Sequence, residues 1–271
     1  MLQLSSGALL SLGLWPGALH AAETAAENFH YVVINDLHYT DEACGQWMTK
    51  VLEQIKSGAD KPDLILMVGD FTENGKETQM SEIKEVFQRS KIPFYGVIGN
   101  HDYLTQADRK AYESVFKDQL NYSFLHKGWQ FIALDTTEGQ KANNTKINSA
   151  TLQWMDDNLK KLDKAKPTIL FTHFPMGILT PSRPVNADDL LDKLLEFNLQ
   201  AVYNGHFHGF TERRKGNAIL TTNKCCSYRK ANHDGTKEKG YFACNTTNGK
   251  IERTFVEVTI PSATSEPSKK V

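Results

Sequence analysis

Polar side chains of types that bind metals or catalyse reactions follow the apolar run 92–98. They form the stretch Gly99-Asn100-His101-Asp102, which brings together an amide, an imidazole and a carboxylate. Such a cluster just past a predicted strand is poor core material and suits a site. We expect Gly99 to free the backbone there for a turn. Because ordinary turns also favour Gly, Asn and Asp, this stretch alone defines no site.

Four further apolar runs end in the same manner. The side chains that follow them are Asp36 and His38, Asp70, His173, and the pair His206 and His208. Sites in α/β sheets form beyond the carboxyl ends of the strands, so parallel neighbours would bring these groups together. Carboxylates, an amide oxygen and imidazoles suit Mn, Fe or Zn. The set contains no cysteine, which argues against a closed structural zinc site.

The donors outnumber those that one tetrahedral ion needs, so we expect two divalent metal ions. Two ions roughly 3.5–4 Å apart are the usual machinery for displacement at phosphorus. They bind phosphoryl oxygens, neutralise charge and lower the pKa of a bound water. Each motif taken singly could be a turn, a helix cap or a pair of solvated histidines. Independent turns, however, have no reason to collect every ligand of one site.

Strands and helices alternate along the stretch that must position these residues. Apolar runs predict strands over 31–35, 64–68, 92–98, 122–124, 129–134, 167–171 and 200–203. Apolar residues at helical spacing predict helices over 46–57, 77–89, 108–118, 149–162 and 187–197. The end of the chain is rich in strands, at 218–222, 241–245 and 251–258, with Asn248-Gly249 as a hairpin turn. This order predicts an α/β layered fold with mixed sheets.

The composition is that of one large globular domain. The chain has 271 residues, a net charge of -1 and 40% hydrophobic residues. We expect this domain over 28–260 and a disordered polar tail over 261–271. The charge balance excludes a strongly basic nucleic-acid-binding protein, and the hydrophobic content excludes an intrinsically disordered chain.

The first 22 residues have the character of a secretory signal peptide or an N-terminal anchor. The apolar run 8–19 is too short to span a bilayer, and small residues follow it. Residues 1–6 contain no Lys or Arg, so cleavage stays open. We expect export to the periplasm or the exterior, where cysteines can pair. Cys244 would then be the nearest partner for Cys225 or Cys226, and the pairing of these and of Cys44 stays open.

The motifs Asp-x-His, Gly-Asp, Gly-Asn-His-Asp, Thr-His and Gly-His-x-His occur here in this order. The ordered set resembles the calcineurin-like metallophosphoesterase superfamily over about residues 29–258. The resemblance implies a four-layer α/β/β/α sandwich of two mixed sheets flanked by helices. It also implies a dinuclear metal site at the carboxyl ends of the strands.

The resemblance further implies a role for each site residue. One metal ion would be held by Asp36, His38 and His208, and the second by Asn100, His173 and His206. Asp70 would bridge them. His101 would face the substrate and stabilise the phosphoryl group or protonate the leaving oxygen. Asp102 would orient His101 or its loop, and the nucleophile would be a hydroxide held on the dinuclear centre.

Within the superfamily, the chain is similar to small bacterial-type phosphodiesterases, including the class III cyclic-nucleotide enzymes. Glu73 stands where purple acid phosphatases carry a tyrosine, and the arginine-rich signature of protein phosphatases is missing after Asp70. Cyclic-nucleotide enzymes often have His-His-Pro where this chain has His173-Phe174-Pro175. We expect a phosphodiesterase acting on a small-molecule phosphate ester, without a nucleic-acid polymer as partner. A phosphomonoesterase of phosphatase or nucleotidase type and an inactive metal-bound scaffold remain alternatives.

A rim of further residues is expected to contact the substrate. The predicted rim comprises Tyr39, Phe71, Glu73, Asn74, Tyr103 and Phe207. The loop 223–239 offers three cations to a phosphate: Lys224, Arg229 and Lys230. A solvated surface turn is the alternative for this loop. The natural substrate, the native metals and the oligomeric state stay open, and membrane contact is expected only if the N-terminal segment is retained.

Overall fold

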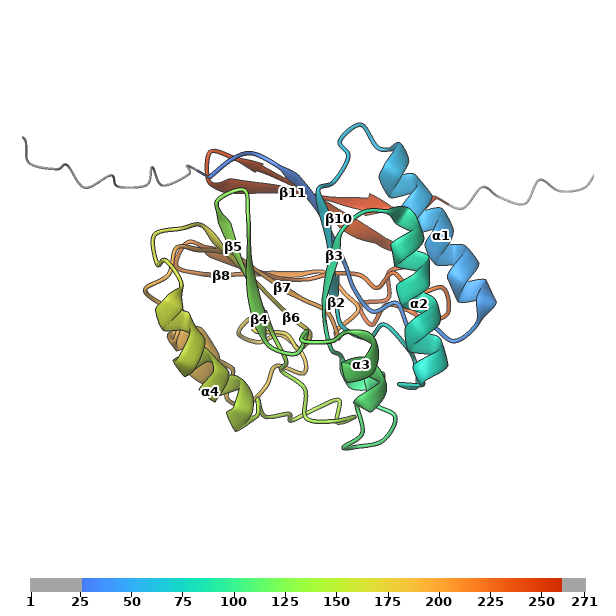
Figure 1. The fold of residues 1–271 in the computed structure, drawn as a ribbon, viewed down its shortest axis with the longest axis horizontal. Coiled ribbons are helices and arrows are strands. Elements are labelled where there is room, and N and C mark those ends of the chain that lie inside the picture. Colours follow the sequence, from blue (N-terminus) through green and yellow to red (C-terminus); the bar gives the residue numbers. More distant parts are fainter. Residues whose placement is uncertain (1–25, 260–271) are drawn as a thin grey trace, which may run out of the picture.

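Two mixed sheets lie face to face, with helices on both outer sides (Figure 1). The computed structural model describes residues 26–259. The predicted signal segment 1–22 and tail 261–271 lie outside the described residues. Helices α1 and α2 cover one sheet, and α4 lies on the opposite side of the molecule. The predicted four-layer α/β/β/α sandwich is thereby confirmed.

The first sheet has five strands in the order β11-β10-β1-β2-β3. Their bounds are β1 His30–Ile34, β2 Leu64–Val68, β3 Phe94–Val97, β10 Gly240–Thr247 and β11 Lys250–Glu257. Strands β1, β2 and β3 are parallel, with Val32 opposite Ile65. The hairpin β10–β11 adds antiparallel strands beside β1, and its turn is the predicted Asn248-Gly249. Both turn residues have positive φ, as a tight hairpin requires.

The second sheet has six strands in the order β4-β5-β6-β7-β9-β8. Their bounds are β4 Tyr122–His126, β5 Trp129–Leu134, β6 Thr168–Thr172, β7 Leu199–Asn204, β8 Thr211–Lys215 and β9 Ala218–Thr222. Strands β5, β6, β7 and β9 are parallel, and β4 and β8 pair antiparallel at the two edges. The carboxyl ends of β6 and β7 therefore lie side by side.

Five helices cover the sheets. Their bounds are α1 Glu42–Ser57, α2 Glu77–Ser90, α3 Lys110–Val115, α4 Ser149–Asn158 and α5 Ala187–Asp192. Two 3-10 turns occupy Asn100–Asp102 and Leu159–Lys161. Between residues 26 and 259, no helix is both long and apolar enough to cross a membrane.

Three apolar cores hold the layers together, as alternating burial on both faces of two sheets requires. One joins α1 and α2 to the first sheet and includes Val51, Ile65 and Phe87. A second lies between the sheets, with Tyr31 packed edge-on against Phe131. The third joins the second sheet to α4 and α5. Because the sheets are buried on both faces, the strands are held in place, and so are the ends of the loops that join them.

Some elements differ from the sequence-based expectation. Helix α1 begins at Glu42 rather than residue 46, because the Asp41 side chain accepts a hydrogen bond from the Cys44 backbone and caps it. Helix α5 ends at Asp192 rather than 197, and α3 is likewise shorter than 108–118. Strand β8 was not predicted. Its sequence, Thr-Glu-Arg-Arg-Lys, is charged because it lies at the edge of a sheet.

The four cysteines are free and buried. Cys244 faces the core between the two sheets, whereas Cys226 belongs to the core beneath α1. The first sheet separates these two cores, so of the two partners that the sequence offered for Cys244, Cys226 is ruled out. Cys225 lies in a third place, with its backbone N–H donating to Asn232.

Candidate metal centre

The seven predicted ligands converge at one edge of the two sheets. Asp36 and His38 follow β1, Asp70 follows β2, and Asn100 follows β3. From the second sheet, His173 follows β6, and His206 and His208 follow β7. Six of them are buried, and only His206 is partly exposed. The ligand atoms form two groups that share Asp70.

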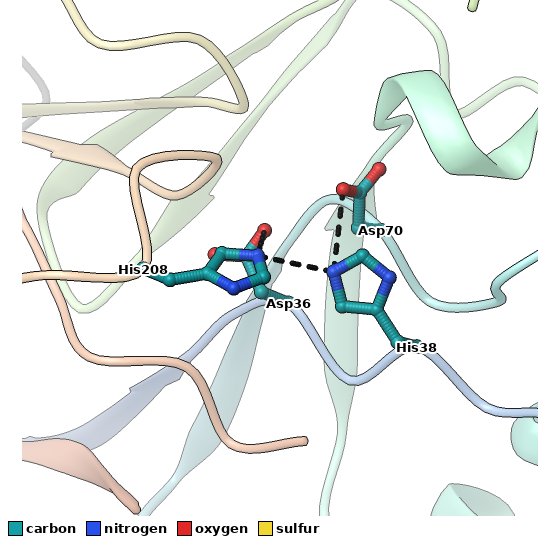
Figure 2. Close-up of side chains that lie close together, drawn as sticks. All are labelled: Asp36, His38, Asp70 and His208. Atoms are coloured by element: carbon teal, nitrogen blue, oxygen red, sulfur yellow. Dashed lines mark hydrogen bonds and ion pairs between the residues drawn. The ribbon is translucent and has the colours of Figure 1, made fainter. Parts of the chain in front are cut away.

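The first group comprises Asp36, His38, Asp70 and His208, whose ligand atoms all lie within 4.8 Å of one another (Figure 2). His208 Nε2 is 3.3 Å from Asp36 Oδ1, and His38 Nε2 is 3.6 Å from Asp70 Oδ2. The two Nε2 atoms are 3.0 Å apart. Two imidazoles and two carboxylates thus point at a common centre.

The second group comprises Asp70, His173 and His206, again with ligand atoms within 4.8 Å. His173 Nε2 is 3.4 Å from Asp70 Oδ2. The amide oxygen of Asn100 lies 3.2 Å from that nitrogen and 3.0 Å from His206 Nδ1. Asp70 therefore stands between the two groups, as a bridging carboxylate would.

With a cation bound, the nitrogens that face these centres would carry lone pairs rather than protons. In each histidine the opposite nitrogen lies near an acceptor, which assigns the proton to that far side. His38 Nδ1 faces Glu73 Oε2 at 2.8 Å, and His208 Nδ1 faces the Ala231 carbonyl at 3.2 Å. The two Nε2 lone pairs then meet at 3.0 Å, an arrangement that a cation between them reconciles.

The second group repeats this arrangement. His173 Nδ1 faces the Val68 carbonyl at 3.2 Å, and His206 Nε2 faces the Ala142 carbonyl at 2.8 Å. The inward nitrogens and the Asn100 oxygen would then all offer lone pairs to a cation between them. Converging acceptors with outer hydrogen bonds that fix the ligand rings are the signature of a metal site. Oxygen and imidazole ligands without thiolate suit a divalent ion of hard or borderline character.

The charges of the site also favour a bound cation. Burial opposes ionisation of Asp36, but His208 and His173 hold the pKa of its carboxyl well below the ordinary range. Burial lowers the pKa of His173, but Asp70 and Asp36 together raise it to about 9. Burial lowers the pKa of His206 to about 4, with the His173 charge adding to the effect. The two carboxylates thus form a negative pocket that attracts positive charge.

The backbone that presents these ligands is strained. Asp36, His38, Asp70, His206 and His208 all have φ between 48° and 65°. Residues other than glycine rarely adopt this left-handed conformation, which costs about 1–3 kcal/mol each and clusters at functional sites. Such turns aim consecutive side chains in directions that a strand cannot. His206 and His208 accordingly serve different groups instead of facing one side of a strand.

Two glycines are required by close approach. A Cβ atom on Gly99 would lie 2.1 Å from Asp70 Oδ1, and one on Gly69 would lie 2.2 Å from His173 Nδ1. The φ of Gly99 is -109°, which any residue can adopt. The expectation that Gly99 frees the backbone was therefore wrong, because this glycine provides space for the Asp70 carboxylate.

His101 belongs to neither of these two groups, and its ring nitrogen lies instead close to His38 and Glu73. Its backbone N–H donates to Asp70 Oδ1 at 2.8 Å, and its Nδ1 lies 3.1 Å from the Glu73 carbonyl. A carbonyl only accepts, so Nδ1 carries the proton and Nε2 remains for a substrate. The side chain is 36% exposed, in contrast to the buried ligands.

Asp102 is fully buried and makes its hydrogen bonds to Thr72 and to the backbone of Gly99. It accepts from the Thr72 and Gly99 N–H groups, each at 2.9 Å, rather than from the His101 ring. Burial and the nearby Asp70 charge raise the pKa of Asp102 to about 7. Asp102 was predicted to orient either the His101 ring or its loop, and the geometry supports the role on the loop.

The groups open into a cleft of about 340 Å³. Besides ligands of both groups and His101, the cleft is lined by Ala142, Asn143, Pro181, Ser182, Phe207, Lys230 and His233. The rim prediction was wrong for Phe71, Tyr39 and Tyr103, which are at most 5% exposed and pack into the core beneath α1 and α2. Asn74 is exposed outside the residues that line the cleft.

Sequence reasoning missed the contact between Glu73 and His38. Glu73 was expected at the rim, but its carboxylate also holds the His38 ring. The residues are 35 positions apart, and only the parallel register of β1 and β2 brings them together. Burial opposes ionisation of Glu73, but hydrogen bonds from His38 and Lys230 lower the pKa of its carboxyl to about 2.

Known proteins share this sequence pattern and fold. The model of the family described as "Calcineurin-like phosphoesterase" matches residues 29–210. A "Probable cyclic nucleotide phosphodiesterase" of Synechococcus is 27% identical over 154 residues, which cover 54% of this chain and 58% of that protein. A "Probable glycerophosphodiester phosphodiesterase" of Arcobacter nitrofigilis is 30% identical over 118 residues, which cover 42% of each.

A solved structure shares the fold at low sequence identity. The purple acid phosphatase from yellow lupin seeds superposes with a TM-score of 0.65 and 12% identity. The match covers 87% of this chain and 52% of the lupin chain. At this identity the likeness shows the fold alone. The chain thus spans little more than half the length of these relatives, or less.

Proposed function

Because this chain belongs to the calcineurin-like phosphoesterase family, we propose that it hydrolyses phosphodiesters with two divalent metal ions. The observation that carries the proposal is the convergence of acceptor atoms in two groups around Asp70. The first ion would be held by Asp36, His38 and His208, and the second by Asn100, His173 and His206. Asp70 is shared between them.

The residues present suit such ions in number and chemistry. When bound, divalent ions at these positions neutralise the ester charge and lower the pKa of water at the reacting phosphorus. The protein contributes the rigid geometry, because each inward lone pair is fixed by an acceptor on the far side of its ring. Mn, Fe and Zn all suit this donor set.

His101 supplies the proton that the leaving group needs. Its Nδ1–H donates to the Glu73 carbonyl, so the ring is oriented with Nε2 toward the cleft. A protonated Nε2 donates to the leaving oxygen as the ester bond breaks, which avoids the release of a free alkoxide. The Asp70 carboxylate fixes the backbone of His101 and thereby joins this proton donor to the ligand groups.

Phosphodiesters are favoured as substrates because both relatives are named as phosphodiesterases. The family model, which matches residues 29–210, includes all seven ligands on which the proposal rests. Because the relatives differ in their named substrates, we extend to this chain only the class of bond that is cleaved. The cleft of about 340 Å³ suits a small organic ester.

The test is hydrolysis of bis-(p-nitrophenyl) phosphate and p-nitrophenyl phosphate by Mn-loaded protein. We expect turnover with preference for the diester, and a fall in kcat of about 10²–10⁴-fold in His101→Ala. The matched control is His126→Ala, since His126 pairs with Asp63 away from the cleft and should leave kcat unchanged. Absence of turnover with any divalent metal would overturn the proposal, and preference for the monoester would replace the substrate class.

A further inference from the structure

One cation of the loop 223–239 lines the cleft, where Glu73 holds it. The sequence offered Lys224, Arg229 and Lys230 on the loop 223–239. Lys224 pairs with Glu238 at 3.1 Å, and Arg229 pairs with Asp41 beside the start of α1. Of the three, only Lys230 lines the cleft that opens over the ligand groups.

The ammonium group of Lys230 is held by Glu73. Nζ lies 2.6 Å from Glu73 Oε1, while Oε2 of the same carboxylate holds His38. Among residues 26–259, Glu73 is the one acceptor recorded for this ammonium group. A lysine has three N–H donors, so two remain for another partner. The side chain is 36% exposed, which leaves it accessible from the cleft.

The backbone of Lys230 is fixed as firmly as its side chain. Its N–H donates to the hydroxyl of buried Ser227 at 3.1 Å, and its carbonyl accepts from Lys239 Nζ. The next residue, Ala231, supplies the carbonyl that fixes His208. Lys230 is therefore built into the support of the first ligand group and differs from a solvated surface lysine.

The position of Glu73 explains why a cation is needed. Its Oε1 lies 3.8 Å from His101 Nδ1, so a negative charge stands next to two residues that line the cleft, His101 and Lys230. Lys230 cancels this charge and at the same time presents free N–H groups there. A compact ammonium group binds phosphate oxygens as a point charge.

We propose that Lys230 is a substrate-binding residue whose ammonium group donates to a non-bridging oxygen of the phosphate ester. This inference rests on the proposed function of the same cleft. It goes beyond that function because it assigns the recognition of the anionic group to the loop 223–239, which carries none of the predicted ligands. The competing role is purely internal, with Lys230 serving only to neutralise Glu73.

The experiment measures the Kd of inorganic phosphate for the Mn-loaded full chain, beside KM and kcat for bis-(p-nitrophenyl) phosphate. In Lys230→Met we expect Kd and KM to rise roughly tenfold or more, with little change in kcat. Lys230→Arg keeps the charge and should recover part of the loss. The matched control is Lys237→Met on the same loop, which should leave both constants unchanged. Mn affinity of each variant shows whether His208 has moved.

A double variant separates the two roles. If Lys230 only neutralised Glu73, Lys230→Met combined with Glu73→Gln would restore phosphate affinity. We expect it to stay weak, because the donor to the phosphate is still missing. Restored affinity, or an unchanged Kd in Lys230→Met, would overturn the inference. If the protein hydrolyses the diester but Lys230→Met leaves Kd and KM unchanged, the role of Lys230 is refuted and the hydrolysis stands. If phosphate binding depends on Lys230 but no turnover occurs, the proposed hydrolysis is refuted and the role of Lys230 in binding stands.

Discussion

Asp102 binds both the backbone N–H of Thr72, at 2.9 Å, and its hydroxyl, at 3.2 Å. Thr72 lies two residues after Asp70, and Asp102 lies two residues after Asn100. The carboxylate therefore ties together the two loops that carry these ligands. A buried carboxylate that accepts from several donors clamps the two loops together, because leaving those buried donors unsatisfied is costly.

Asp102→Asn should weaken this clamp. An amide can accept from Thr72 but would turn its NH₂ group toward the Gly99 N–H, leaving buried donors unpaired at a cost of about 1–3 kcal/mol. We expect a lower free energy of unfolding in urea and lower kcat, with an unshifted pH–rate profile. Full stability with a shifted profile would instead show that Asp102 acts on His101 directly.

Gly99→Ala should disable the centre while leaving the fold intact. The new Cβ would lie 2.1 Å from Asp70 Oδ1 and 2.2 Å from the Asp70 backbone nitrogen, so one of the loops must move. Misplacement by about 1 Å can cost about 10²-fold in rate. The control is Gly58→Ala, where φ is -58° and the nearest atom is 3.4 Å away. Equal kcat/KM in the two variants would contradict the crowding argument.

Removal of metal by a chelator should abolish hydrolysis and lower Tm. The carboxylates and lone pairs of the two groups lose the cation that offsets their repulsion. An ion present at 100 times its Kd stabilises the folded protein by about 2.7 kcal/mol. Calorimetry with and without chelator measures the change in Tm. Hydrolysis assays in chelator and after readdition of Mn measure the loss and recovery of activity. Hydrolysis that persists in chelator would be incompatible with the proposed centre.

Thiol counting tests the state of the cysteines. All four thiols are free and buried, so the native protein should react slowly with a thiol reagent. Denatured, unreduced protein should then release four equivalents, which absorbance of the reagent measures. Two equivalents would mean that a disulfide forms after all, and with it a rearrangement of Cys225 or Cys44, since Cys226 and Cys244 face different cores.

Local sequence predicted the strands and the residues at their ends, because burial on both faces gives continuous apolar runs such as β2 and β6. It could not say which aromatic residues near the centre turn inward. Phe71 follows Asp70 directly, yet its ring packs 5.1 Å from Phe116 in the core. That direction is set by the left-handed turn at Asp70, which has no sequence signature of its own.

Long-range contacts were the second limit. Glu73 meets His38 through the pairing of β1 and β2, and Lys230 meets Glu73 across 157 positions of sequence. Both contacts need the register of the sheets and the path of a long loop. The charged strand β8 was not predicted for a different reason, because an edge strand need not alternate between apolar and polar residues.

Each ligand group draws on both sheets. Asp36 and His38 from the first sheet meet His208 from the second, and Asn100 from the first meets His173 and His206 from the second. Bound ions would thus connect two halves of the molecule whose sheets are hydrogen-bonded separately. The stability of the contact between the two sheets would then depend on the metal concentration. The two halves of the sandwich would separate most readily in a cell that is short of metal.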